Sequence, residues 1–264
     1  MKTFADSVVL ITGASSGFGA EFARQLAPVA KTLILAARRT ERLESLRDEL
    51  ARPGLTIQLY TVDLADAAAT AAFLQELARG DQRVTLLINN AGLGDHGLFE
   101  DCDWPKVEQM LLVNVVALTR LTRALLPELM AARGAVLNVS SVASLLPLPT
   151  LGVYAATKAY VTSFSEALRA ELRGTGVSVT ALCPGPVTTE FFDVAQRAGN
   201  TDAAPAPAIL KVSAQLVVAT ALKAVLHDRA RVIPGWLTSV AMTLASCVPM
   251  FLMRLGMSPP RKKK

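Results

Sequence analysis

Short apolar runs alternate with longer amphipathic stretches along most of this 264-residue chain. The runs are rich in Val, Ile, Leu and Thr, as strands are, and the stretches carry apolar residues every three or four positions, as helices do. Strands are predicted at residues 8–12, 32–36, 56–62, 84–88, 135–139, 177–182 and 231–233. Helices are predicted at residues 20–27, 40–51, 67–78, 104–130, 213–226 and 236–257, and a further helix carries Tyr154. This order predicts an α/β fold with a doubly wound parallel sheet of about seven strands, covered by helices on both faces.

Polar motifs directly follow several of the predicted strands. The carboxyl ends of parallel strands lie at one edge of the sheet, where ligands bind. The first motif is a glycine-rich turn, Gly13 to Gly19, between the first strand and the first helix. Such a turn places backbone N–H groups and the helix dipole against a pyrophosphate. Its spacing is GxxxGxG and not GxGxxG, so a plain tight connection is the alternative interpretation.

The second strand ends in Ala37-Arg38-Arg39, without an acid. In a dinucleotide-binding fold an acid near this position accepts the ribose 2′-hydroxyl, whereas arginine suits a 2′-phosphate. The sequence therefore favours NADP(H) over NAD(H). In the alternative interpretation both arginines are solvated residues at the start of the next helix.

Tyr154 and Lys158 are four residues apart, so both side chains should leave one face of a helix. An ammonium close to a phenol favours the phenolate and is expected to lower the tyrosine pKa towards the range of a general acid/base. Ser141 lies upstream at the end of an apolar strand, and Asn114 lies in an apolar helix, where its carboxamide needs a partner. The alternative interpretation is that Tyr-x-x-x-Lys occurs on this helix by chance. The other motifs weigh against that interpretation.

Composition narrows the function classes. Of the formal charge of +5, Arg261 and the three lysines after it supply four, so a nucleic-acid surface is not indicated. The three cysteines have no paired spacing, which argues against a disulfide framework. With two histidines and no ligand cluster, neither a metal site nor a Ser-His-Asp triad is expected. The N-terminal apolar run is too short for a signal peptide, which predicts a cytoplasmic protein.

The segment 236–257 is unusually apolar. Its apolar residues fall on one helical stripe, and Pro249 is expected to kink or divide the helix. Three interpretations stay open: packing on its own domain or on a sister subunit, lying in a membrane interface with the basic tail on the head groups, or crossing the membrane. Ser239, Thr243, Ser246 and the proline count against a membrane span.

Taken together, the motifs resemble the short-chain dehydrogenase/reductase family, in its single-domain branch. Thr12-Gly-Ala-Ser-Ser-Gly-Phe-Gly19 is similar to the TGxxxGxG cofactor turn of that family, Asn89-Asn-Ala-Gly92 to its NNAG strand end, and Tyr154-Ala-Ala-Thr-Lys158 to its YxxxK. Ser141 stands thirteen residues before Tyr154, which is the usual separation, and is preferred to Ser140. The resemblance implies a Rossmann-like dinucleotide-binding and catalytic domain over residues 1–233. Within it, the helical and strand pattern breaks down at 190–212, which makes this segment a candidate substrate lid. Residues 234–264, an apolar helical extension with a basic tail, depart from the family pattern.

The resemblance also implies the roles of the site residues. Tyr154 would be the general acid/base, Lys158 would lower its pKa and bind the nicotinamide ribose, Ser141 would hydrogen-bond the substrate oxygen, and Asn114 would hold a water that links Lys158 to solvent. The cofactor would contact the glycine turn, the arginines and the ends of the later strands, through Gly13, Ser15, Ser16, Gly17, Phe18, Gly19, Arg38, Arg39, Asp63, Leu64, Asn90, Gly92, Tyr154, Lys158, Pro184, Gly185, Val187 and Thr188.

The predicted substrate wall is apolar, which suits a lipophilic ketone, aldehyde or secondary alcohol. It comprises Leu93, His96, Leu145, Leu146, Leu151, Phe191 and Phe192. By analogy the protein would form a homodimer or homotetramer. The competing hypothesis is a non-catalytic dinucleotide-binding protein that is attached to a membrane, or holds a partner, through residues 236–264.

Overall fold

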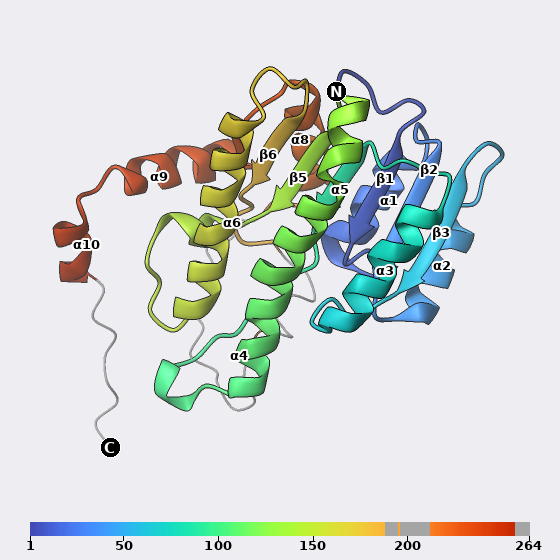
Figure 1. Ribbon diagram of the computed structural model, residues 1–264. Helices are drawn as coiled ribbons and strands as arrows, with labels where there is room; N and C mark the ends of the chain where they lie inside the picture. Colours follow the sequence, from blue (N-terminus) through green and yellow to red (C-terminus); the bar gives the residue numbers. More distant parts are fainter. Residues whose placement is uncertain (188–194, 196–211, 257–264) are drawn as a thin grey trace.

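The computed structural model describes residues 1–187, 195 and 212–256. Within them, seven parallel strands form one sheet in the order β3-β2-β1-β4-β5-β6-β7 (Figure 1). The strands are β1 (Val8–Thr12), β2 (Thr32–Ala37), β3 (Thr56–Thr61), β4 (Leu86–Asn89), β5 (Ala135–Val139), β6 (Ser178–Leu182) and β7 (Arg231–Val232). From β1 the chain builds outward to β3 on one side and from β4 to β7 on the other. This confirms the predicted doubly wound parallel sheet.

One face of the sheet is covered by α1 (Gly17–Leu26), α2 (Thr40–Leu50) and α8 (Ala214–Leu226). Phe22, Leu43 and Val217 from these helices pack against Ile11 and Leu35 of the central strands, and all five are fully buried. Since alternate strand residues point to opposite faces, the neighbouring residues Leu10 and Ile34 belong to the core on the other side. Strands that are buried on both faces explain the continuous apolar runs in the sequence.

The other face is covered by α3 (Ala67–Arg79), α5 (Leu118–Ala132) and α6 (Gly152–Glu171). Phe73, Leu125 and Leu168 from these helices pack on this side of the sheet. The single helix that the sequence predicts at 104–130 is divided: α4 (Trp104–Leu111) is followed by a π-helical segment, η2 (Leu112–Ala117), and then by α5. The helix carrying Asn114 is therefore wider around that residue than the prediction assumed.

Short helices and the C-terminal elements complete the described chain. η1 (Phe99–Asp101) and η3 (Val142–Leu145) are 3-10 turns. The predicted helix at 236–257 is two helices, α9 (Trp236–Ser246) and α10 (Met250–Gly256), and Pro249 lies between them as expected. Figure 1 shows both helices extending away from the sheet and its covering helices.

Candidate active site

The glycine turn leads from β1 into α1 with little free space behind it. A Cβ on Gly19 would overlap the carbonyl oxygen of Gly13 and lie 2.7 Å from Asn90 Nδ2. Gly17, by contrast, has a φ of +55° and nothing within 4 Å of its Cβ position. The turn is thus closed towards the protein and open at Gly17, where α1 begins. An anionic group can approach the N–H groups of that first turn.

Arg39 lies just after β2 and reaches across to the glycine turn. Its Nη2 donates to Ser16 Oγ at 2.7 Å and to Ser15 Oγ at 3.2 Å, and its Nε donates to Ser15 Oγ at 3.3 Å. Ser16 occupies the N-cap position of α1, but its side chain makes no capping hydrogen bond. The guanidinium is therefore held next to the turn, and Arg38, also exposed, lines the same pocket.

Asn90 fixes the end of β4 against the end of β1. Its Nδ2 donates to the carbonyl oxygens of Thr12, at 2.9 Å, and Gly13, at 3.2 Å. Thr12 Oγ1 in turn accepts from the backbone N–H groups of Asn90 and Ala91, each at 3.0 Å. These bonds explain why an amide side chain and a hydroxyl stand at these strand ends: they hold the glycine turn in place.

Asn114 is 1 % exposed, and protein groups satisfy its carboxamide. Its Oδ1 accepts from Leu93 N at 2.8 Å, and its Nδ2 donates to Leu93 O at 2.9 Å and to Thr157 Oγ1 at 3.0 Å. The sequence analysis expected a water as this partner, whereas the structure supplies the backbone after β4 and a threonine of α6. The water link to Lys158 stays a prediction.

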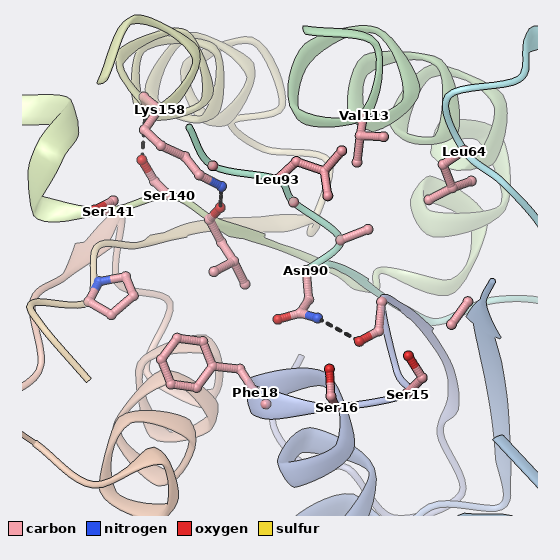
Figure 2. A pocket seen from close by; sticks show the side chains of 18 of the residues that line it. Ser15, Ser16, Phe18, Leu64, Asn90, Leu93, Val113, Ser140, Ser141 and Lys158 are labelled. Atoms are coloured by element: carbon pink, nitrogen blue, oxygen red, sulfur yellow. Dashed lines mark hydrogen bonds between the residues drawn. The ribbon is translucent and has the colours of Figure 1, made fainter. Parts of the chain in front are cut away.

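Lys158 is 4 % exposed, and its Nζ donates to Val139 O at 2.9 Å, as Figure 2 shows. A Cβ on Gly92 would lie 3.3 Å from both Lys158 Nζ and Asn114 Oδ1, so Gly92 leaves room for these two polar atoms. Burial disfavours the charged ammonium and lowers the pKa of Lys158 to about 8.

Tyr154 lies one turn before Lys158 on α6, with Lys158 Nζ 5.8 Å from the centroid of its ring. Burial raises the pKa of Tyr154 to about 12, and a hydrogen bond with the Ser141 side chain acts in the opposite direction. The pKa of Tyr154 is therefore raised in the protein alone and not lowered towards the range of a general acid/base, as the sequence analysis expected. The loss of solvation outweighs the other influences on the phenolate.

The two serines after β5 have different surroundings. Ser140 is 2 % exposed; its Oγ donates to Lys158 O at 2.9 Å and shares a 2.7 Å hydrogen bond with Thr162 Oγ1. Ser141 is half-buried, caps η3 through Ala143 N at 3.1 Å and bonds Tyr154. The role of Ser141 in binding the substrate oxygen stays a prediction, whereas the Ser140 hydroxyl is engaged inside the protein.

These residues share one pocket with a cavity of about 330 Å³. Figure 2 shows Ser141 and Lys158 at one end of it and Ser15 and Ser16 at the other. The pocket is lined by Gly13, Ser15, Ser16, Gly17, Phe18, Ala37, Arg38, Arg39, Val62, Asp63, Leu64, Asn90, Ala91, Gly92, Leu93, Gly94, Val113, Val139, Ser140, Ser141, Tyr154, Lys158, Pro184, Gly185 and Val187. The structure thus brings together the described residues that the sequence analysis assigned to the cofactor, except Gly19, which does not line the pocket.

Of the described residues in the predicted substrate wall, one lines the pocket. Leu93 lines the pocket, whereas His96, Leu145, Leu146 and Leu151 are not among its lining residues. His96 instead shares a 3.1 Å hydrogen bond with Thr150 Oγ1. Thr188, Phe191, Phe192 and most of the predicted lid at 190–212 lie outside the described residues.

Sequence reasoning missed Val113, Val139 and Thr157. The carbonyl oxygen of Val139 accepts a hydrogen bond from Lys158 Nζ, and Thr157 Oγ1 accepts one from Asn114 Nδ2. The place of Val139 at the last position of a strand at the ligand-binding edge could have identified it. Thr157 has no comparable signal, because its contact depends on how α6 faces the π-helical segment. Among the described residues, no group of three or more His, Cys, Asp and Glu side chains could hold a metal ion.

The model of the short chain dehydrogenase family matches residues 7–200. Sulfoacetaldehyde reductase 2 of Chromohalobacter salexigens is 40% identical over 200 residues, which are 75% of this chain and 78% of that protein. Serine 3-dehydrogenase of Agrobacterium fabrum is 38% identical over 200 residues, 74% of this chain and 77% of its own. The chain belongs to the short-chain dehydrogenase/reductase family.

Solved structures of the family have the same fold. A short-chain dehydrogenase from Sphingobium yanoikuyae in complex with NADPH has a TM-score of 0.77 and 29% identity and covers 98% of both chains. A short chain dehydrogenase/reductase from Burkholderia phymatum in complex with NAD has a TM-score of 0.81 and 26% identity over 100% of both chains. The protein is thus an NAD(P)-dependent oxidoreductase that acts on CH-OH and carbonyl groups.

Proposed function

We propose that the protein uses NADP(H) in preference to NAD(H) and interconverts a lipophilic ketone or aldehyde and its alcohol. The observation that carries the cofactor preference is Arg39, whose guanidinium bonds Ser15 and Ser16 beside the glycine turn. No carboxylate stands at positions 37–39 to accept a ribose 2′-hydroxyl. A guanidinium fixed there suits a 2′-phosphate, which it binds through two parallel N–H groups.

The pocket fits a dinucleotide on its own chemistry. It has a turn that is open at Gly17, where α1 begins, cations at Arg38 and Arg39, and a proton donor at the far end. Gly13 to Gly19 would hold the pyrophosphate, Asp63 and Leu64 the adenine side, and Lys158 the nicotinamide ribose. When bound, the nicotinamide supplies the hydride that adds to the carbonyl carbon.

Tyr154 completes the reduction by giving its phenolic proton to the carbonyl oxygen. A phenol with a pKa of about 12 remains protonated at neutral pH. It is still a stronger acid than an aliphatic alcohol. Ser141, which bonds Tyr154, orients the carbonyl oxygen and stabilises the negative charge that develops on it. The buried ammonium of Lys158 adds positive potential on the same side.

The substrate end of the pocket supports a lipophilic substrate. Leu93, Val113, Pro184 and Val187 contribute apolar surface to the pocket, and Lys158 is the one cation beside Tyr154 among the described lining residues. Sulfoacetaldehyde and serine, after which the two relatives are named, carry charged groups. Among the described lining residues, the other cations that could bind such a group are Arg38 and Arg39, and they lie at the opposite end of the pocket.

The test measures kcat/KM for NADPH and NADH with a panel of hydrophobic ketones and aldehydes, sulfoacetaldehyde and serine. Wild-type protein should prefer NADPH and a hydrophobic carbonyl. Arg39→Ala should lower kcat/KM for NADPH by roughly 10- to 100-fold, the value of one or two charge-assisted hydrogen bonds, and leave NADH unchanged. Arg47→Ala, an exposed arginine of α2 paired with Asp48, is the matched control. Equal use of both cofactors by wild type and Arg39→Ala would contradict the proposal.

A further inference from the structure

α9 contacts the domain with one face and leaves the opposite face uncovered. Thr238 is 4 % exposed, and its Cγ2 lies 2.9 Å from where Gly185 would carry a Cβ. Trp236, Val240 and Leu244 recur every four residues and so share a stripe on roughly the opposite side of the helix. They are 74 %, 53 % and 66 % exposed. The described residues of the domain therefore leave the stripe uncovered.

α10 continues the uncovered surface. Met250, Phe251 and Leu252 are 46 %, 64 % and 47 % exposed. Single apolar residues scattered over a surface are normal. Here, three exposed apolar residues on α9 are followed by three on α10, and such a concentration indicates a contact surface. We call residues 236–254 the C-terminal arm. Its only formal charge is Arg254, which is exposed.

The charge of the surrounding chain identifies the partner. After Asp228 the sequence contains no acid up to Lys264, whereas Arg254, Arg261 and the three final lysines are all cationic. Anionic lipid head groups attract such clusters of Lys and Arg. Trp236 and Phe251 are side chains typical of a membrane–water interface. Pairing of the arm with the arm of a second copy would instead bring like charges together.

Neither helix of the arm is long enough to cross a bilayer. α9 has 11 residues and α10 has 7, and Pro249 separates them. At 1.5 Å per residue α9 is about 17 Å long, against about 30 Å of hydrocarbon. One helical stretch, Trp104–Ala132, is long and apolar enough by composition, but Leu121, Leu125 and Leu129 pack it against the sheet.

We propose that the C-terminal arm binds the surface of a membrane that contains anionic lipid, with Trp236, Val240, Leu244 and Phe251 inserted at the interface. α9 also contacts η3, which Ser141 caps, so the attachment begins beside the active-site pocket. The arm would hold the oxidoreductase at the surface where a lipophilic substrate is dissolved. The contact itself does not depend on which cofactor or substrate the enzyme uses.

The test is sedimentation of the full chain with vesicles of phosphatidylcholine, alone or with one third phosphatidylglycerol. Wild-type protein should sediment with the anionic vesicles and bind the neutral ones roughly tenfold more weakly. The variant L244D/F251D should lose at least about tenfold in affinity for the anionic vesicles. The matched control is V29D/L216D, which places the same new charges on exposed apolar residues of the domain, 47 % and 55 % exposed. It should bind like wild type.

Two further measurements make the result decisive. Both double variants should keep the wild-type melting temperature and soluble activity, because none of the four side chains is buried. Arg254→Glu should weaken binding to anionic vesicles without any change of apolar surface. The proposal would be overturned if the wild-type protein sedimented with neither kind of vesicle. Light scattering that shows L244D/F251D, but not V29D/L216D, converting an oligomer to monomers would assign the arm to a second copy instead.

Discussion

Lys158 and Tyr154 lie one turn apart on α6, yet the ammonium donates to Val139 O, 2.9 Å away, and lies 5.8 Å from the centroid of the tyrosine ring. The lysine therefore acts on the site through its charge and through its position between β5 and the pocket. Burial shifts both groups towards their neutral forms: the pKa of Lys158 is about 8 and that of Tyr154 about 12. At neutral pH the site thus holds a protonated phenol beside a lysine that is still mostly charged and loses its charge as the pH rises through about 8.

The first prediction concerns the pH profile of reduction. Tyr154 stays protonated up to about pH 12, whereas Lys158 loses its charge as the pH rises through about 8. We expect kcat/KM for the cofactor, which reports the free enzyme, to be constant from pH 6 to 7.5 and to fall up to about tenfold per pH unit above 8. A profile that stays flat to pH 10 would show that the charge of Lys158 is not required.

The second prediction concerns stability. The pKa of Lys158 is lowered from 10.5 to about 8, so between these values the unfolded chain binds more protons than the native protein. Native stability therefore rises with pH across this window, and the full cost of the buried charge applies below pH 8. Lys158→Met removes this dependence. The difference in free energy of unfolding between wild type and the variant should change by about 3 kcal/mol in favour of wild type from pH 7.5 to 10.5.

Urea unfolding at a series of pH values measures this difference. Lys223→Met, which changes an exposed lysine on α8, is the control and should show no such trend. A Lys158→Met difference that is independent of pH would contradict the assignment of a buried, destabilising ammonium.

The third prediction separates the two adjacent serines. Ser140→Ala removes the buried hydrogen bonds that its hydroxyl makes with Lys158 O and Thr162 Oγ1, so it should lower the free energy of unfolding by about 1–3 kcal/mol. Ser141→Ala removes the group that bonds Tyr154 and should lower kcat by about 10²-fold, as the loss of one oxyanion donor does. Its cost in stability should be about 1 kcal/mol or less, for the lost cap of η3. Thermal melting and steady-state kinetics of both variants check this prediction. It would be contradicted if Ser140→Ala mainly lowered kcat and Ser141→Ala mainly lowered the stability.

The fourth prediction uses two glycines at helix starts. Gly19→Ala would drive a Cβ into the backbone of Gly13, which cannot move without disrupting the turn. It should cost more than about 3 kcal/mol and abolish cofactor binding. Gly152→Ala, at the start of α6, meets nothing within 4 Å and should be neutral or stabilising by up to about 1 kcal/mol. Equal melting temperatures for the two variants would contradict this account of the turn.

The strand–helix order and the strand-end motifs were predictable because they depend on local pattern. Apolar runs such as Val8–Thr12 are buried on both faces, so their composition alone identifies them. Once the strands are parallel, the residues after them lie at one edge, which is why Gly13, Asn90 and Ser141 share a pocket.

Other features depend on tertiary packing and left no local signal. The π-helical turn at Asn114 arises where its carboxamide bonds the backbone of Leu93 and Thr157 of α6, contacts that join three elements distant in sequence. The direction of the Tyr154 pKa shift depends on how deeply the pocket buries the phenol, and spacing on a helix does not reveal burial. Likewise, the apolar stripe of α9 was visible in the sequence, but only the structure shows that it points away from its own domain.

The central claim is that Tyr154 donates the proton in an NADPH-dependent carbonyl reduction. The most direct measurement is NADPH oxidation with the best hydrophobic carbonyl of the panel, for wild type and Tyr154→Phe. NADPH binding, followed by its fluorescence, controls for the fold and should not change. We expect kcat of the variant to fall by about 10²- to 10⁴-fold, the contribution of a positioned general acid. A variant that binds NADPH and retains most of the wild-type turnover would contradict the assignment of the proton to Tyr154.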